Sequence, residues 1–312
     1  MTFKLCAFCV VCSLLCSSRI FAQHDAEVQS DLFAHKRINV FQGVDLPNSV
    51  GSAHYDSIAR NRSWRIDEPR IYAYVPGLEE RNGAAIIIIP GGGYVKQAFE
   101  TSGVSLAKWC NTFGVTAFVL LHRLPNQPDL QDGSVAPVQD AQRAVKWVRA
   151  HASDFGVDPR RIGVMGCSAG AHLSACVASL SQDFSKCGDS LDSLSPRPDF
   201  AILVSPAANI VGSFFKKAHP AIEMMMQQFR VDKLITSASA PMLCIHASDD
   251  PTVNPLNSIE IYRALQLAGV SQSSIHIFPN GAHRISLRSQ PGSTALWPQI
   301  AEDWLREIGM IP

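Results

Sequence analysis

Residues 161–173 read Arg161-Ile162-Gly163-Val164-Met165-Gly166-Cys167-Ser168-Ala169-Gly170-Ala171-His172-Leu173. An apolar run comes first, a serine between two glycines follows, and the residues after it have a helical pattern. This order predicts a strand, a sharp turn and a helix, with Ser168 at the turn. Backbone strain at such a turn pushes the hydroxyl out of the sheet, and Gly166 and Gly170 leave room for the close strand and helix. Ser168 is therefore the candidate nucleophile, although Gly-x-Ser-x-Gly also occurs in ordinary loops.

Strands and helices are predicted to alternate on both sides of this stretch. Residues 84–89 are apolar throughout, which is typical of a central parallel strand buried on both faces. Further strands are predicted at 71–75, 115–121, 162–165, 200–204, 242–245 and 275–278. Helices are predicted at 104–113, at 138–152, from the serine through 180, at 257–267 and at 294–308. The succession predicts an α/β fold with a mostly parallel central sheet and helices on both faces.

The first 22 residues differ from the rest of the chain. Lys4 supplies a positive charge, residues 5–15 form an apolar stretch too short to span a bilayer, and Ala22 offers a cleavage point. The pattern predicts a secretory signal peptide over residues 1–22, and hence a secreted or periplasmic protein with no stable membrane insertion after cleavage. An uncleaved anchor is the alternative.

The remaining chain is predicted to contain one catalytic domain. Residues 23–63 are polar with little periodicity, which predicts an extended N-terminal arm. Residues 64–312 are predicted to form the domain itself, since one α/β core of this size is ordinary. An insertion at about 207–240 interrupts the alternation, and it is either a short cap over the site or a locally packed helical connection.

Composition excludes several classes of protein. Lys+Arg and Asp+Glu both number 27, so no basic field attracts nucleic acid. The cysteines beyond residue 22 are odd in number and widely spaced, which fits neither a disulfide scaffold nor a zinc site. They are Cys110, Cys167, Cys176, Cys187 and Cys244. Carboxylates and histidines show no metal-ligand spacing, so we expect no metal and no cofactor. The oligomeric state is left open.

A nucleophilic serine needs a base, and at a strand–turn–helix site the acid and then the histidine follow the serine in the chain. His276 and His283 are the two histidines that lie beyond the plausible acid loop. His276 lies inside a predicted strand, whereas His283 follows a loop at the edge where such bases occur. We therefore favour His283 as the base.

The orienting acid is expected directly after the strand at 242–245. Asp249 and Asp250 are adjacent there. We favour Asp250 because Asp-Pro-x-Val is a common form of this acid turn, and we keep Asp249 as the alternative. Both could instead cap the turn before the next helix.

An oxyanion hole is the third requirement, because the tetrahedral intermediate places negative charge on a former carbonyl oxygen. The sequence Pro90-Gly91-Gly92-Gly93-Tyr94 follows the buried strand directly, and its glycines let backbone amides approach a ligand. Gly92 and Gly93 are the expected donors, joined by the amide of Ala169 after the nucleophile. The loop lacks the glycine and lysine pattern of a phosphate-binding loop.

Three further polar residues lie near these motifs in the sequence. Arg123 and Asp140 are hypothesised to pair across adjacent loops, the alternatives being helix capping by Asp140 and a solvated arginine. His172, one turn beyond Ser168, is expected to be a packed residue rather than a ligand.

Together these motifs resemble a known family, the secreted bacterial α/β-hydrolase esterases related to the hormone-sensitive lipase type and to acetylxylan esterases. The resemblance covers about residues 70–308 and rests on residues 90–94, 140–144, 147–149, 166–173, 250–253 and 281–283. It implies the α/β-hydrolase fold and a catalytic triad of Ser168, Asp250 and His283, with Gly92 and Gly93 in the oxyanion hole. It also implies a serine esterase for short acyl esters, with acetyl esters of xylan or other carbohydrate as the expected substrates.

Three alternatives to this function are consistent with parts of the sequence. The first is a general short-chain carboxylesterase or lipase acting on esters that are not carbohydrates. The second is a serine peptidase of the same fold, which we disfavour because such peptidases typically carry an extra domain that selects peptides. The third is a non-catalytic binding relative, which would be expected to lack part of the triad.

Overall fold

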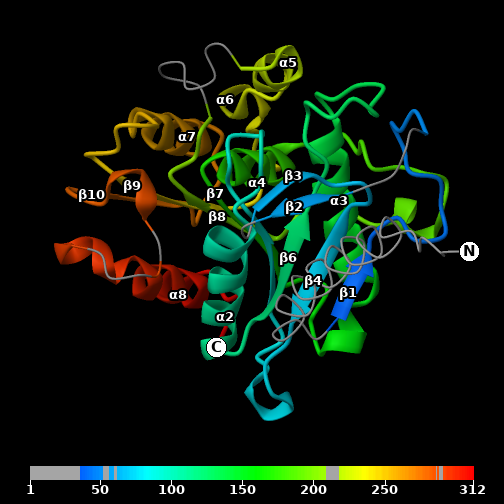
Figure 1. Cartoon of the computed structure of the whole chain (residues 1–312). Coiled ribbons are helices and arrows are strands. Elements are labelled where there is room, and N and C mark those ends of the chain that lie inside the picture. Colours follow the sequence, from blue (N-terminus) through cyan, green and yellow to red (C-terminus); the bar gives the residue numbers. More distant parts are fainter. Residues whose placement is uncertain (1–35, 52–55, 60–61, 209–217, 286, 288–290) are drawn as a thin grey trace, which may run out of the picture.

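A computed structural model describes residues 36–51, 56–59, 62–208, 218–285, 287 and 291–312 (Figure 1). The predicted signal peptide at 1–22 lies outside the described residues, as do the Phe214 and Phe215 of the insertion. Within the described ranges, no helix has both the length and the apolar character needed to cross a bilayer.

The centre of the molecule is an eight-stranded sheet in the order β1-β4-β6-β5-β7-β8-β9-β10. The strands are β1 (Lys36–Asn39), β4 (Arg70–Tyr74), β5 (Ala85–Ile89), β6 (Thr116–Leu121), β7 (Ile162–Cys167), β8 (Phe200–Val204), β9 (Met242–Ala247) and β10 (Ser274–Phe278). Neighbours from β6 to β10 pair in parallel, while β4 is antiparallel to both β1 and β6. The mostly parallel sheet confirms the predicted fold class.

Helices cover both faces of this sheet, as Figure 1 shows. On one face α2 (Ser105–Thr112) and α8 (Trp297–Glu307) bury Leu106 and Trp304 against the sheet. On the other face lie α3 (Ala136–Ala150), α4 (Ala169–Ser179) and α7 (Leu256–Leu267). All five residues of β5 are buried, because a strand with helices above and below it has no solvated face.

The described residues before 64 include segments that pair in sheets. Strand β1 pairs antiparallel with β4, and Ile38, Val40 and Phe41 are buried in the main core. A four-residue strand is too short to show periodicity in the sequence, which is why its place in the sheet was not predicted. Strands β2 (Ser57–Ala59) and β3 (Arg62–Arg65) form a separate two-stranded sheet.

The insertion contains two helices in its described part. These are α5 (Pro220–Gln228) and α6 (Val231–Leu234), and α6 packs against α4 (Figure 1). Ile222, Met225 and Phe229 are fully or almost fully buried in the same core as α4. The described part of the insertion therefore packs as part of the domain.

Candidate active site

Ser168 lies between β7 and α4 with φ 55° and ψ −119°, a region that non-glycine residues rarely adopt. The flanking glycines make this turn possible. A Cβ on Gly166 would lie 2.2 Å from the backbone of Gly170, and a Cβ on Gly170 would lie 2.1 Å from the carbonyl oxygen of Ile89. Any larger residue at either position would force the strand and the helix apart.

The fold brings three predicted site residues together. His283 Nε2 lies 2.9 Å from Ser168 Oγ, and His283 Nδ1 lies 2.7 Å from Asp250 Oδ2. With Nδ1–H donating to the carboxylate, Nε2 is left to accept the serine proton. His276, the alternative base, lies on β10 and contacts Ser274 instead.

Asp250 is held by donors on both of its oxygens. Oδ1 accepts hydrogen bonds from the backbone N–H groups of Thr252 and Val253, at 2.8 and 2.9 Å. Oδ2 faces His283 and also Nε2 of His246, which lies 3.2 Å away. Burial alone would raise the pKa of the Asp250 carboxyl, but the hydrogen bonds from the two histidines and the backbone lower that pKa well below its usual range.

His246 was not predicted as a site residue. It lies in β9, and its side chain is fully buried. The sequence holds one signal for it, because His246 is a polar residue directly after the apolar residues 242–245.

Asp249 points to a different partner from Asp250. It is exposed, and its Oδ1 accepts a hydrogen bond of 2.8 Å from the backbone N–H of Ala282, the residue before His283. Ala282 has a positive φ of 47°, so this contact helps to hold a strained turn. The structure thus places Asp250 against the histidine and Asp249 against the loop that carries it.

The glycine loop after β5 lies against the nucleophile. A Cβ on Gly91 would come 3.3 Å from Ser168 Cβ, and one on Gly92 would come 2.0 Å from the carbonyl oxygen of Lys96. Among the described residues, the backbone N–H groups of Gly92, Gly93 and Ala169 donate to no other protein group. The amide of Ala169 adjoins Ser168, and the amides of Gly92 and Gly93 directly follow Gly91, which lies against the serine.

Tyr94 ties this loop to the nucleophile helix. Its φ is 59°, and its hydroxyl lies 2.8 Å from His172 Nδ1. His172 Nε2 in turn lies 2.9 Å from the carbonyl oxygen of Phe229 at the end of α5, so Nε2 donates and Nδ1 accepts from Tyr94. Burial lowers the pKa of His172 to about 4. His172 is thus a packed residue, as expected, and it connects the glycine loop, α4 and the insertion.

Arg123 and Asp140 form a fully buried ion pair between the segment after β6 and α3. Both side chains have 0% exposure, and Arg123 Nη2 lies 2.6 Å from Asp140 Oδ1. The hypothesis that these residues pair is confirmed, and the solvated alternative is wrong. Removing one partner of such a pair typically destabilises a protein by about 3–5 kcal/mol, because the other charge is then buried without a partner.

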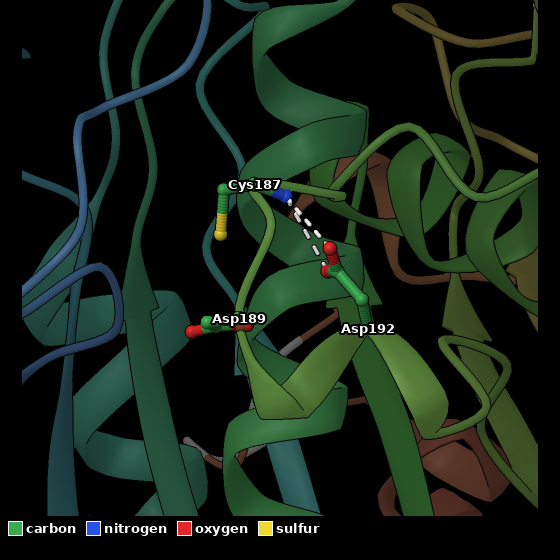
Figure 2. Close-up of side chains that lie close together, drawn as sticks. All are labelled: Cys187, Asp189 and Asp192. Atoms are coloured by element: carbon green, nitrogen blue, oxygen red, sulfur yellow. Dashed lines mark hydrogen bonds between the residues drawn. The ribbon is translucent and has the colours of Figure 1, made fainter.

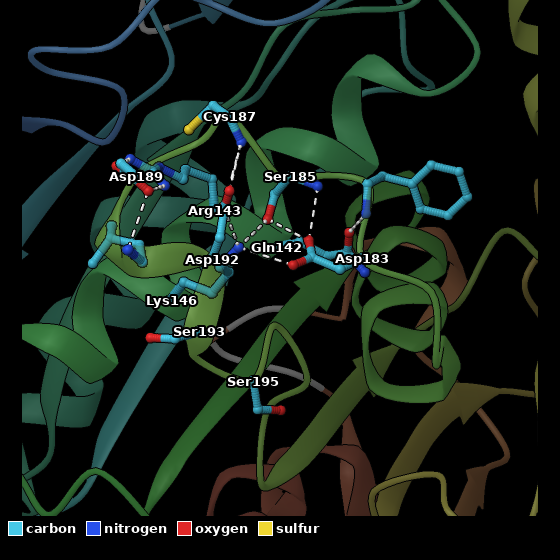
Figure 3. A network of polar contacts seen from close by, with 12 residues as sticks. Gln142, Arg143, Lys146, Asp183, Ser185, Cys187, Asp189, Asp192, Ser193 and Ser195 are labelled. Carbon is cyan, nitrogen blue, oxygen red and sulfur yellow. Dashed lines mark hydrogen bonds and ion pairs between the residues drawn. The ribbon is translucent and has the colours of Figure 1, made fainter.

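Cys187, Asp189 and Asp192 come together in space although their spacing did not predict it (Figure 2). Figure 3 shows that basic side chains of α3 already neutralise the carboxylates: Arg143 pairs with Asp189, and Lys146 lies 3.1 Å from Asp192. Desolvation raises the pKa of the Cys187 thiol, which disfavours the thiolate that a metal would need. We interpret this cluster as a network of ion pairs that connects the loop after α4 to α3. The five cysteines beyond residue 22 are all free.

The fold and this geometry define a class of protein. A strained serine at a strand–helix turn, a buried aspartate and then a histidine follow one another in the chain order of serine hydrolases with the α/β-hydrolase fold.

Comparisons with known proteins agree with this class. The BD-FAE family model matches residues 71–202, and the prolyl oligopeptidase family model matches residues 214–307. An acetylxylan esterase from Xylanibacter ruminicola is 28% identical over 216 residues, which cover 66% of this chain and 42% of that protein. Endo-1,4-beta-xylanase B from Butyrivibrio fibrisolvens is 25% identical over 70% of this chain and 35% of its own length. The chain thus spans less than half the length of these curated relatives.

A solved structure matches over nearly the whole of both chains. The acetyl ester-xyloside bifunctional hydrolase from Caldicellulosiruptor lactoaceticus has a TM-score of 0.71 and 30% identity, covering 89% of this chain and 98% of that one. A carboxylesterase from Lactobacillus plantarum has a TM-score of 0.65 at 24% identity, which shows the fold alone. The chain belongs to the α/β-hydrolase esterases, the family that its motifs resemble.

Proposed function

We propose that the protein is a serine esterase that hydrolyses short acyl esters, acetyl esters in particular. One observation carries the proposal: Ser168 Oγ lies 2.9 Å from His283 Nε2, while Nδ1 of the same ring is bonded to Asp250. A histidine held in this way can take a proton from the serine and return it to a leaving group.

The reaction follows from these positions. His283 takes the hydroxyl proton as Ser168 Oγ attacks the ester carbonyl, and the amides of Gly92, Gly93 and Ala169 stabilise the oxyanion. His283 then protonates the departing alcohol, which leaves an acyl-enzyme on Ser168. Water attacks that acyl group with His283 again as the base, and the carboxylic acid departs.

Acetylated xylan or another acetylated carbohydrate is the substrate class we propose. The support comes from relatives whose names refer to acetylxylan, xylan and xylosides. A general carboxylesterase or lipase for other esters is the alternative, because a carboxylesterase also shares the fold.

A substrate panel tests this proposal. The purified protein is incubated with 4-nitrophenyl esters of acetate, butyrate and octanoate, with acetylated xylan, and with a peptide 4-nitroanilide. We expect release of acetic acid from the xylan and a kcat/KM for the acetate at least roughly tenfold above that for the octanoate. Hydrolysis of the long ester alone would contradict the acetyl preference, and an inert xylan with active acetate would favour the general carboxylesterase.

A peptidase is the second candidate function. The match of residues 214–307 to the prolyl oligopeptidase family favours it, as does a dipeptidyl-peptidase 4 from Giardia intestinalis that is 22% identical over 54% of this chain. The anilide in the same panel decides between the two, since a peptidase would cleave it and leave the esters as the poorer substrates.

We also propose that the protein is exported. The support is the sequence of residues 1–22, with a positive start, a short apolar stretch and a small residue at position 22. N-terminal sequencing of protein secreted by a bacterial host should begin at Gln23. A cell-bound protein that retains residues 1–22 would instead indicate an uncleaved anchor.

A further inference from the structure

We propose that His246 is a positioning residue for the Ser168–His283–Asp250 set, and that Ser258 sets its tautomer. This inference rests on the proposed function. It assigns a second histidine to the aspartate, on the same carboxylate oxygen that His283 contacts.

The hydrogen-bond roles of His246 follow from its neighbours. Nε2 lies 3.2 Å from Asp250 Oδ2 and 3.2 Å from the carbonyl oxygen of Val253, and both of these are acceptors. Nε2 must therefore carry a proton and donate. Nδ1 lies 2.7 Å from the hydroxyl of Ser258, on the first turn of α7. In the neutral ring the hydroxyl donates to Nδ1, which holds the proton on Nε2.

His246 supplies the fourth hydrogen-bond donor to the buried carboxylate of Asp250. A carboxylate has about four lone-pair sites, and Asp250 has four donors: the N–H groups of Thr252 and Val253 on Oδ1, and His283 and His246 on Oδ2. The Asp250 side chain has 0% exposure, so no solvent replaces a donor that is lost. Without His246 the oxygen that binds His283 would keep one donor and could rotate away from the histidine ring.

The position of His246 makes it rigid enough for this role. It lies within β9, opposite Ile277 of β10, and its side chain has 0% exposure. Ser258 is also fully buried. A hydrogen-bonded chain therefore runs from α7 through β9 to the base: Ser258, His246, Asp250, His283 and Ser168. Side chains locked by packing and by such bonds hold a site in its productive geometry.

The test compares two replacements of His246. His246→Leu removes the donor, whereas His246→Gln keeps an N–H that can reach Asp250. With a 4-nitrophenyl acetate assay, we expect His246→Leu to lower kcat about 10- to 100-fold with KM within about threefold of wild type. His246→Gln should keep kcat within about threefold. His276→Gln, on the neighbouring strand, is the matched control and should behave like wild type.

A double-variant cycle separates positioning from a merely structural role. If His246 acts through Asp250, then His246→Leu should have little further effect in an Asp250→Asn background, roughly twofold or less. An equal loss in both backgrounds would overturn the proposal. So would a wild-type kcat in His246→Leu, or an equal loss in the Gln and Leu variants.

A third variant covers the case in which His246→Leu does not fold. Ser258→Ala removes the hydroxyl that donates to His246 Nδ1, so the ring proton is no longer held on Nε2 from that side. We expect this variant to lower kcat by about threefold or more with KM unchanged. Wild-type kcat in Ser258→Ala beside an unfolded His246→Leu would overturn the proposal. Full activity of Ser168→Ala in the same series would instead overturn the proposed function, and the role of His246 with it.

Discussion

Ser168→Ala is expected to lose at least several hundredfold in kcat for a chromogenic acetate ester. The variant keeps the oxyanion amides and the substrate contacts, so only the residual catalysis of binding and electrostatics is left. Because an alanine removes a single oxygen, we expect the free energy of unfolding to change little. Steady-state kinetics at a fixed pH measure the loss.

Ser179→Ala is the matched control for this variant. Ser179 is a buried serine in the last turn of the same helix, and its hydroxyl has no partner among the described residues. Its variant should have wild-type kcat. A fluorophosphonate reagent should label the wild type and Ser179→Ala but not Ser168→Ala. Wild-type hydrolysis by Ser168→Ala would rule out Ser168 as the nucleophile.

Asp250→Asn is expected to lower kcat on the order of 10³- to 10⁴-fold. The asparagine amide can turn its NH₂ toward His283 Nδ1, which would place the ring proton on Nε2 and leave no acceptor for the serine. The loss should appear in kcat more than in KM, because Asp250 does not touch substrate.

Asp249→Asn is the sharpest control, since it changes the adjacent residue in the same way. Its amide oxygen can still accept the hydrogen bond from Ala282 N–H, so we expect kcat within a few-fold of wild type. A large loss in Asp249→Asn together with a mild one in Asp250→Asn would make Asp249 the orienting acid.

The acid stability of the two variants gives a second comparison. The hydrogen bonds to Asp250 lower its pKa below the usual value, so its charged form stabilises the folded protein above the unfolded-state pKa of about 3.9. That contribution is lost as the pH falls through the lower folded pKa. Asp250→Asn should lack this component of acid unfolding, and Asp249→Asn should retain it.

Much of the fold was predictable because it follows from short-range patterns. The run at 84–89 indicated a buried strand, and β5 is buried at every position. The strand at 200–204 was predicted with the bounds that β8 has. The turn at Ser168 was also predictable, because a serine between two glycines follows an apolar run. In the structure, a Cβ on Gly166 or Gly170 would meet backbone atoms. Strand β1 was not predictable, because four residues carry too little pattern.

The candidate site was predictable in its members but not in its contacts. The order of serine, acid and histidine pointed to Ser168, Asp250 and His283, and their catalytic roles stay predictions that the variants test. His246 was not predictable as a site residue, because the chain order of serine, acid and histidine gives no role to a second histidine before the acid. The proposed role of His246 depends on the turn that brings Asp250 Oδ2 within 3.2 Å of its Nε2.

By itself the sequence determined the alternation of strands and helices, the strained serine turn and the glycine loop, because each depends on neighbours a few residues apart. The tertiary structure alone decided which of two adjacent aspartates faces the histidine, and that Arg123 is buried against Asp140. Ser168 and His283 are 115 positions apart, and the parallel sheet brings the ends of β7, β9 and β10 to one edge. The physical reason is that contacts between residues far apart in the sequence form only when the folded chain packs its strands and helices together.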